Sequence, residues 1–93
     1  MPYQTVALIG KPQHAATHDS LNILADYLLE KGCKLLVEES IAKELDTDNL
    51  QSCNLVTIGK EADLAVVVGG DGSMLGAARV LARFDIHVVG VNR

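Results

Sequence analysis

Apolar and polar residues follow one another along the chain in blocks that have the lengths of strands and helices. Four short apolar runs, rich in β-branched residues, are typical of strands buried on both faces. They occupy residues 5–9, 34–38, 64–68 and 86–91. From Thr17 to Lys31 the apolar residues recur at every third or fourth position, which indicates one buried face of a helix. We expect Thr17 to cap this helix and Gly32 to end it.

A second helix is predicted from about Ser73 to Arg83, where alanine and leucine dominate. Residues 40–54 carry the weakest pattern, with a short helix indicated near Ile41 and a turn at 46–49. The order β-α-β, variable piece, β-α-β predicts an α/β three-layer sandwich with a mainly parallel, Rossmann-like sheet. One helix fewer is available than a doubly wound sheet needs. We therefore expect residues 1–93 to be the front part of a longer protein.

Composition narrows the class of protein. The chain has 93 residues, 48% of them hydrophobic, which suits one α/β domain with an aliphatic core, since it holds one Phe, two Tyr and no Trp. Its formal net charge of -4 and scarce aromatic residues argue against nucleic-acid binding. No apolar run approaches the ~20 residues of a membrane span, and Cys33 and Cys53 show no metal-ligand spacing. These features predict a cytoplasmic protein with no membrane contact.

The candidate functional residues lie mostly between the third apolar run and the second predicted helix. A strand, a glycine turn (Gly69, Gly70, Gly72) and a helix N-terminus follow in direct succession. Exposed N–H groups and the helix dipole favour an anion there, and glycine lets a phosphate approach the backbone. Lys11 ends the first strand at the corresponding position, as either a solvated loop lysine or a phosphate contact.

Common glycine motifs do not fit this turn. Gly76 comes one residue late for the dinucleotide fingerprint G-x-G-x-x-G, no lysine follows Gly72 as in a P-loop, and Ser73 is not placed as in G-x-S-x-G. The Asp71 carboxylate would repel a phosphate, so its presence in this turn needs a separate explanation. It suits phosphoryl transfer, because a carboxylate can accept a proton from an attacking hydroxyl. Nucleotide binding without transfer and a structural turn, in which Asp71 caps the helix, remain open.

The sequence around the turn resembles that of a known family. The run G-G-D-G-S-x-L at 69–75, with D-L-A-V-V-V before it and G-A-A-R-V-L-A-R and H-V-V-G-V-N-R after it, closely resembles the NAD kinases, most of all the bacterial enzymes. The opening V-A-L-I-G-K-P fits the same family. The glycine–aspartate motif alone is shared with diacylglycerol-type lipid kinases and 6-phosphofructokinases.

The resemblance implies a reaction and a set of residues. ATP, or polyphosphate in some members, phosphorylates the 2′-hydroxyl of the adenosine ribose of NAD to give NADP, with a divalent cation such as Mg²⁺. Asp71 matches the proton acceptor and, with Gly72, would contact NAD, while Gly69, Gly70, Gly72 and Ser73 would line the phosphate-binding turn. Many members carry Thr in place of Ser73 and Arg in place of Gly76. No residue of this chain is assigned as a metal ligand.

The resemblance also implies what lies outside these 93 residues. Family members continue into a mostly β domain that carries much of the NAD pocket, and the full-length enzymes are commonly homo-oligomers. The isolated 93 residues are therefore expected to be inactive. Two alternatives stay open: another kinase with the same motif, acting on a lipid or a sugar phosphate, and a nucleotide-binding module without catalysis.

Overall fold

A computed structural model describes residues 3–10, 15–69 and 71–92 of the chain. Strands and helices alternate along most of this length. In chain order the elements are β1 (Thr5–Gly10), α1 (Ala15–Glu30), β2 (Lys34–Glu38), a short 3₁₀ helix η1 (Ala42–Glu44), β3 (Gln51–Cys53), α2 (Leu55–Glu61), β4 (Leu64–Gly69), α3 (Asp71–Leu81) and β5 (His87–Asn92).

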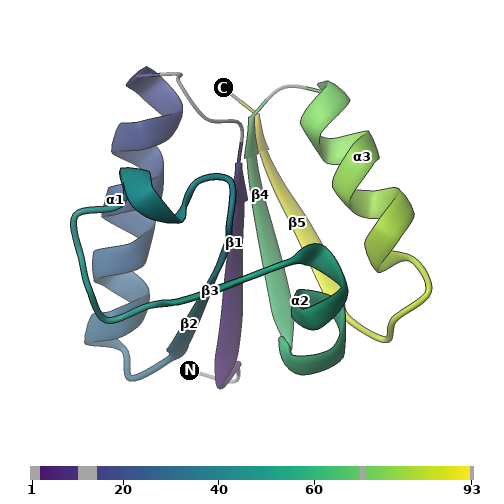
Figure 1. Cartoon of the computed structure of the whole chain (residues 1–93), viewed down its shortest axis with the longest axis horizontal. Coiled ribbons are helices and arrows are strands. Elements are labelled where there is room, and N and C mark those ends of the chain that lie inside the picture. The colour runs from purple at the N-terminus through teal and green to yellow at the C-terminus, as the bar shows by residue number, and fades with distance from the viewer. Residues whose placement is uncertain (1–2, 11–14, 70, 93) are drawn as a thin grey trace.

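The strands form one five-stranded parallel sheet in the order β3-β2-β1-β4-β5. Helix α1 packs on one face of the sheet, and α2 and α3 pack on the other (Figure 1). This arrangement confirms the predicted three-layer α/β sandwich. The sheet is parallel throughout the described residues, whereas the sequence predicted only that it would be mainly parallel.

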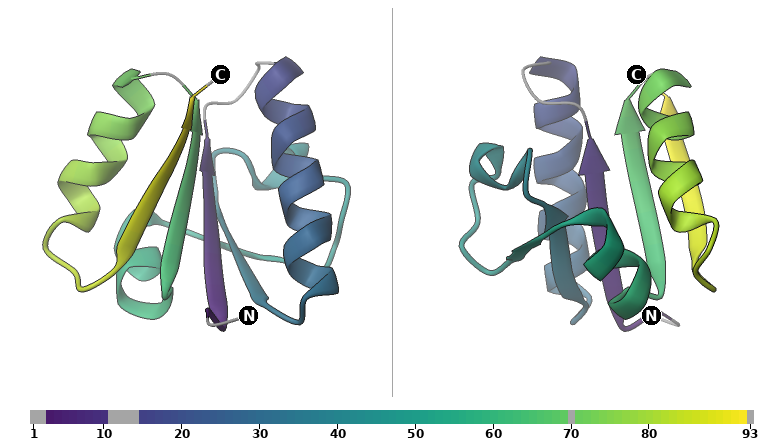
Figure 2. Two further views of the ribbon diagram at one scale, coloured as in Figure 1. Left: turned by 180° about the vertical axis from the view of Figure 1, so that it is seen from behind. Right: turned by 45° about the vertical axis from the view of Figure 1, so that its right-hand side comes forward.

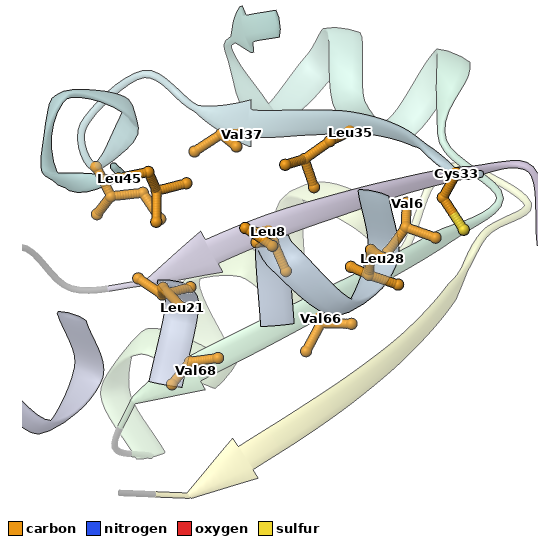
Figure 3. Close-up of a cluster of buried hydrophobic side chains, with 12 residues drawn as sticks. Val6, Leu8, Leu21, Leu28, Cys33, Leu35, Val37, Leu45, Val66 and Val68 are labelled. Atoms are coloured by element: carbon orange, nitrogen blue, oxygen red, sulfur yellow. The ribbon is translucent and has the colours of Figure 1, made fainter. Parts of the chain in front are cut away.

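Alternate residues of the central strands point into two separate apolar cores. Val6 and Leu8 of β1 pack on the α1 side, and Ala7 and Ile9 pack on the side of α2 and α3. Figure 3 shows the α1-side core, in which aliphatic side chains from α1 and three strands meet. Strands buried on both faces are apolar at every position, which is why they are short continuous runs in the sequence.

Helix α1 ends where the sequence predicts but begins earlier. Gly32 adopts a φ of 82°, and the N–H groups of Gly32 and Cys33 donate to the carbonyls of Leu29 and Leu28, at 3.0 Å each. This is a Schellman ending, in which glycine takes the left-handed position. The helix starts at Ala15, so Thr17 lies inside its first turn and the prediction that Thr17 caps the helix is wrong.

The stretch that the sequence left undefined contains a strand and a helix. The expected short helix near Ile41 is η1, and the short edge strand β3 and helix α2 follow it. Helix α2 is capped by Asn54, whose side chain accepts the Thr57 N–H at 2.9 Å. One hydrogen bond joins α1 to the connection between β2 and β3: Oδ1 of Asn22 accepts the backbone N–H of Asp46 at 2.9 Å.

Strand β1 is tied to the start of β4 by a carboxylate. Oδ2 of Asp63 accepts the backbone N–H groups of Gln4 and Thr5 at 3.0 and 2.9 Å, and the N–H of Asp63 donates to the Thr5 carbonyl at 2.8 Å. These two backbone hydrogen bonds hold the pKa of the Asp63 carboxyl below its ordinary value, because they favour the charged form.

The lowered pKa of Asp63 has a defined effect on stability. Its contribution to folding is present above the ordinary Asp pKa of about 3.9 and is lost as the pH falls through the lower folded-state pKa. We expect Asp63→Asn to reduce the urea midpoint at pH 7. The difference between the variant and the unsubstituted protein should shrink as the pH is lowered through this range. A difference that stays constant from pH 7 to pH 2.5 would contradict this account.

Helices α2 and α3 approach closely at one glycine. A Cβ placed on the buried Gly59 of α2 would lie 2.6 Å from Cγ and 2.7 Å from Cε2 of Phe84, in the turn after α3. Real side chains do not tolerate such distances, so the ring would have to move. Gly59 therefore allows the single Phe of the chain to pack over α2.

We expect Gly59→Ala to lower the free energy of unfolding by about 1–3 kcal/mol through overpacking. Gly76→Ala is the matched control, because a Cβ on this helical glycine of α3 would meet nothing within 4 Å. That control should raise stability by up to about 1 kcal/mol, as alanine favours helix. Urea unfolding of both variants measures the difference, and equal effects would refute the contact. Adding Phe84→Ala should remove much of the Gly59→Ala penalty.

Candidate functional site

The order of the strands creates a topological switch point between β1 and β4. The chain leaves β1 toward β2 on one side and leaves β4 toward β5 on the other, although β1 and β4 are neighbours. In open α/β sheets, ligands bind outside the carboxyl ends of the strands at such a switch point. Here the two strand ends are Gly10 and Gly69. The predicted turn therefore follows β4, one of the two strands at this switch point.

Gly69 is the last residue of β4 and turns the chain toward α3. It is buried, has a φ of 154°, and pairs in register with Asn92 at the end of β5. A φ in this region is adopted almost only by glycine, since a side chain would clash with the backbone. The conformation explains why a glycine ends the apolar run, and α3 follows on one face of the sheet (Figure 2).

Asp71 is the first residue of α3, two residues before the predicted start of the helix. A carboxylate is favoured in a first helical turn because it faces the positive end of the helix dipole. Gly72 and Ser73 follow within that turn, and Gly72 is exposed. The structure thus places the backbone of Gly69, Asp71, Gly72 and Ser73 together at the carboxyl edge of β4. Lys11 and Gly70 lie outside the described residues.

Two further ionisable groups lie at this edge, on strands that sequence reasoning did not connect with it. Glu38 ends β2 and pairs in register with Cys53 of β3. Burial raises the pKa of the half-buried Glu38 carboxyl, although a hydrogen bond from Ser40 opposes the shift. Burial also raises the pKa of the Cys53 thiol, which keeps it protonated and unreactive at neutral pH. Cys33 and Cys53 are both buried free thiols.

The described residues offer neither a metal-binding cluster nor a membrane-spanning helix. They contain no group of three or more His, Cys, Asp or Glu side chains that could hold a metal ion. No helix in the described part of the chain is long and apolar enough to cross a membrane.

Fold and turn together define a Rossmann-like α/β domain with its candidate ligand site at the switch point. Comparison with known proteins narrows this class. The sequence profile of the ATP-NAD kinase N-terminal domain matches residues 6–93. The chain is 53% identical over 92 residues to the NAD kinase of Aeromonas salmonicida (strain A449), covering 99% of this chain and 31% of that protein. It is 55% identical over 91 residues to that of Shewanella sp. (strain ANA-3), covering 98% and 29%.

This chain belongs to the NAD kinase family and corresponds to its N-terminal domain. A solved structure, yeast NADH kinase complexed with NADH, has the same fold with a TM-score of 0.76 and 20% identity. That match covers 97% of this chain and 32% of the yeast chain. The 93 residues span 29–31% of the length of the curated relatives named above.

Proposed function

We propose that this chain is the part of a full-length NAD kinase that supplies the phosphate-binding turn and the proton acceptor. The supporting observation is the position of Asp71, which begins α3 directly after the glycine turn at the β1–β4 switch point. In a chain of this family, a carboxylate at that position would accept the proton of a nucleotide hydroxyl beside a bound phosphate. The reaction is transfer of the γ-phosphoryl group of ATP to the 2′-hydroxyl of the adenosine ribose of NAD.

The residues of the turn have different roles in the reaction. A carboxylate oxygen of Asp71 accepts the proton of the 2′-hydroxyl as the hydroxyl oxygen attacks the γ-phosphorus. The bond from the γ-phosphorus to the β–γ bridging oxygen breaks, and the electron pair leaves with ADP. The glycine turn and the backbone N–H groups of Gly72 and Ser73, at the N-terminus of α3, offset the negative charge of the phosphates. The products are NADP, ADP and one proton.

A divalent cation such as Mg²⁺ would neutralise charge on the phosphate oxygens. This chain would contribute at most Asp71 to its coordination, and the phosphates and the rest of the protein would contribute the other ligands. We assign Lys11 as a further phosphate contact, since it follows Gly10 at the end of β1. The remaining length of the protein would form a mostly β domain that closes the other side of the cleft.

The partners follow from the same proposal. NAD and ATP are the substrates, and nucleic acid and membranes have no part. The full-length protein assembles as a homo-oligomer in the cytoplasm. Gel filtration with light scattering on the full-length protein tests the assembly independently of catalysis.

In the full-length protein we expect Asp71→Asn to lower the rate of NADP formation by about 10²–10⁴-fold, because the proton acceptor is lost. Asp63→Asn is the matched control, since it makes the same change at the amino end of β4, away from the turn. Assayed well below the unfolding temperature, the control should retain the turnover of the unsubstituted protein. Near-normal turnover by a folded Asp71→Asn variant would overturn the assignment of the base.

The substrate is tested separately from the base. The full-length protein is offered NAD, diacylglycerol and fructose 6-phosphate, each with ATP and Mg²⁺, and ADP release is measured. We expect phosphorylation of NAD alone. Phosphorylation of the lipid or the sugar phosphate without NAD would show that the turn serves another kinase reaction.

The isolated 93 residues should not phosphorylate NAD. The turn contributes one wall of the cleft, and bound substrates would stay exposed to water on the other side, where productive positioning is lost. Incubation of the 93-residue chain with NAD, ATP and Mg²⁺, with a sensitive assay for NADP, checks this expectation. Measurable NADP formation by the 93-residue chain alone would contradict it.

A further inference from the structure

Strand β2 ends in a carboxylate at the edge of the sheet that holds the candidate site. Val37 packs in the α1-side core, so the alternation along the strand directs the next side chain, Glu38, to the opposite face. The parallel pairing of β2 with β1, and of β1 with β4, brings Glu38 to the same edge as Gly10 and Gly69. An ionisable side chain therefore lies one strand away from the β1–β4 switch point.

The stability of the fold does not explain a carboxylate at this position. Glu38 is half-buried, and a hydrogen bond from the Ser40 side chain favours its charged form. Burial and the negative charge of Glu39 outweigh that bond and raise the pKa of the Glu38 carboxyl. The groups that shift this pKa include no cation of the described residues. Carboxylates that are kept partly buried at such a cost are common at functional sites.

The place of Glu38 along the chain is that of the acidic residue in nucleotide-binding βαβ units. In these units the turn after the first strand meets the phosphates, and an acidic side chain about 20 residues further on accepts a hydrogen bond from the ribose. Glu38 closes the unit formed by β1, α1 and β2 at about this distance beyond the turn. The turn after β1 lacks the fingerprint G-x-G-x-x-G, so the match lies in the order of the elements and the acid.

A nucleotide fits between Glu38 and the turn that begins α3. Strands β2 and β4 flank β1, so their ends are separated by two strand spacings, roughly 10 Å. A ribose with three phosphates can bridge that separation. Gly10 and Gly69, at the ends of β1 and β4, have no side chains and let phosphates approach the backbone. A carboxylate repels phosphates and accepts hydrogen bonds from hydroxyl groups, so Glu38 suits the ribose end.

We propose that Glu38 binds the ribose of the phosphoryl donor, a nucleoside triphosphate whose γ-phosphate lies at the turn of Asp71. The Glu38 carboxylate accepts hydrogen bonds from the ribose hydroxyls, and the triphosphate extends from β2 across the end of β1 to β4. The hydroxyls supply the donors that the half-buried carboxylate lacks. The inference rests on the proposed function and deepens it, because it assigns the side of the turn on which the donor lies and a residue that recognises it as a nucleotide.

The test compares ATP with 2′,3′-dideoxy-ATP as the phosphoryl donor of the full-length protein. Release of the nucleoside diphosphate is measured with Mg²⁺ and whichever acceptor the protein phosphorylates. We expect kcat/KM for ATP to exceed that for the dideoxy analogue by about 10- to 100-fold, the range for hydrogen bonds to a charged group. Glu38→Ala should lower kcat/KM for ATP to the level of the analogue. It should leave kcat/KM for the analogue and the KM of the acceptor unchanged.

Glu39→Ala is the matched control, because it removes the same charge from the next residue, which is exposed and lies beyond the end of β2. This control should keep the full preference for ATP over the dideoxy analogue. Glu38→Gln has nearly the same shape as the natural side chain and replaces Glu38→Ala if that variant fails to fold. It should weaken the preference for ATP in the same direction, because the charge of the hydrogen-bond acceptor is lost.

Three results would overturn the proposal. Equal kcat/KM for the two donors in the unsubstituted protein would mean that nothing binds the ribose hydroxyls. An equal loss with both donors in Glu38→Ala would assign Glu38 a structural role. A higher KM for the acceptor, with the KM of ATP unchanged, would place the acceptor at Glu38.

The comparison does not depend on the identity of the acceptor or of the base. A result against NAD as substrate, or against Asp71 as proton acceptor, leaves the ratio between the two donors measurable. If no acceptor is phosphorylated, calorimetric titration of the full-length protein with each nucleotide and Mg²⁺ gives the same comparison through Kd. Equal Kd values for the two nucleotides would then overturn the proposal.

Discussion

The parallel pairing of β1 with β4 is the constraint on which the rest of the structure depends. Both strands are central, and their side chains enter the two cores alternately. A slip of one residue would exchange the side chains of the two faces, so the packing fixes the register. The same register, in which Gly10 pairs with Val68, brings the ends of both strands to one edge of the sheet. The geometry of the candidate site is thus a consequence of core packing.

The two ends of β4 have different roles. At the amino end, Asp63 holds the backbone of β1 through two hydrogen bonds. At the carboxyl end, Gly69 turns the chain with a backbone conformation that only glycine adopts readily, and Asp71 begins α3. Substitution of Asp63 should therefore change stability, whereas substitution of Asp71 should change chemistry. The buried run between them keeps the two ends a fixed distance apart.

Sequence reasoning succeeded where burial determines the pattern. The four apolar runs became β1, β2, β4 and β5, and the periodic helix became α1. It failed at β3 and α2, for a local reason. Helix α2 spans only seven residues, including Val56, Thr57, Ile58 and Gly59, none of which favours helix. A local cap by Asn54 and two tertiary contacts stabilise this helix: Ile58 is buried in the core, and Gly59 leaves room for the Phe84 ring. A single-sequence pattern does not report such contacts.

The residue types identified the turn, and the surrounding sequence identified its family. Neither identified what each side chain contributes. Strand–glycine–helix succession predicts an anion site. It does not predict that β1 would be the neighbour of β4, because strand order depends on long-range pairing. Nor could the pattern reveal Cys53 beside Glu38 at the same edge, since this placement depends on the pairing of β2 with β3.

The bonds made by Asn22 and Asp63 share a property that bears on how this domain can vary. In each, a side chain binds the main chain of a distant segment: Asn22 binds the N–H of Asp46, and Asp63 binds those of Gln4 and Thr5. Every residue except proline offers that N–H. The tolerance for replacement should therefore be one-sided. Replacing Asn22 or Asp63 removes the hydrogen bonds. Positions 4, 5 and 46 can instead accept any residue except proline and still donate the N–H groups that join the segments.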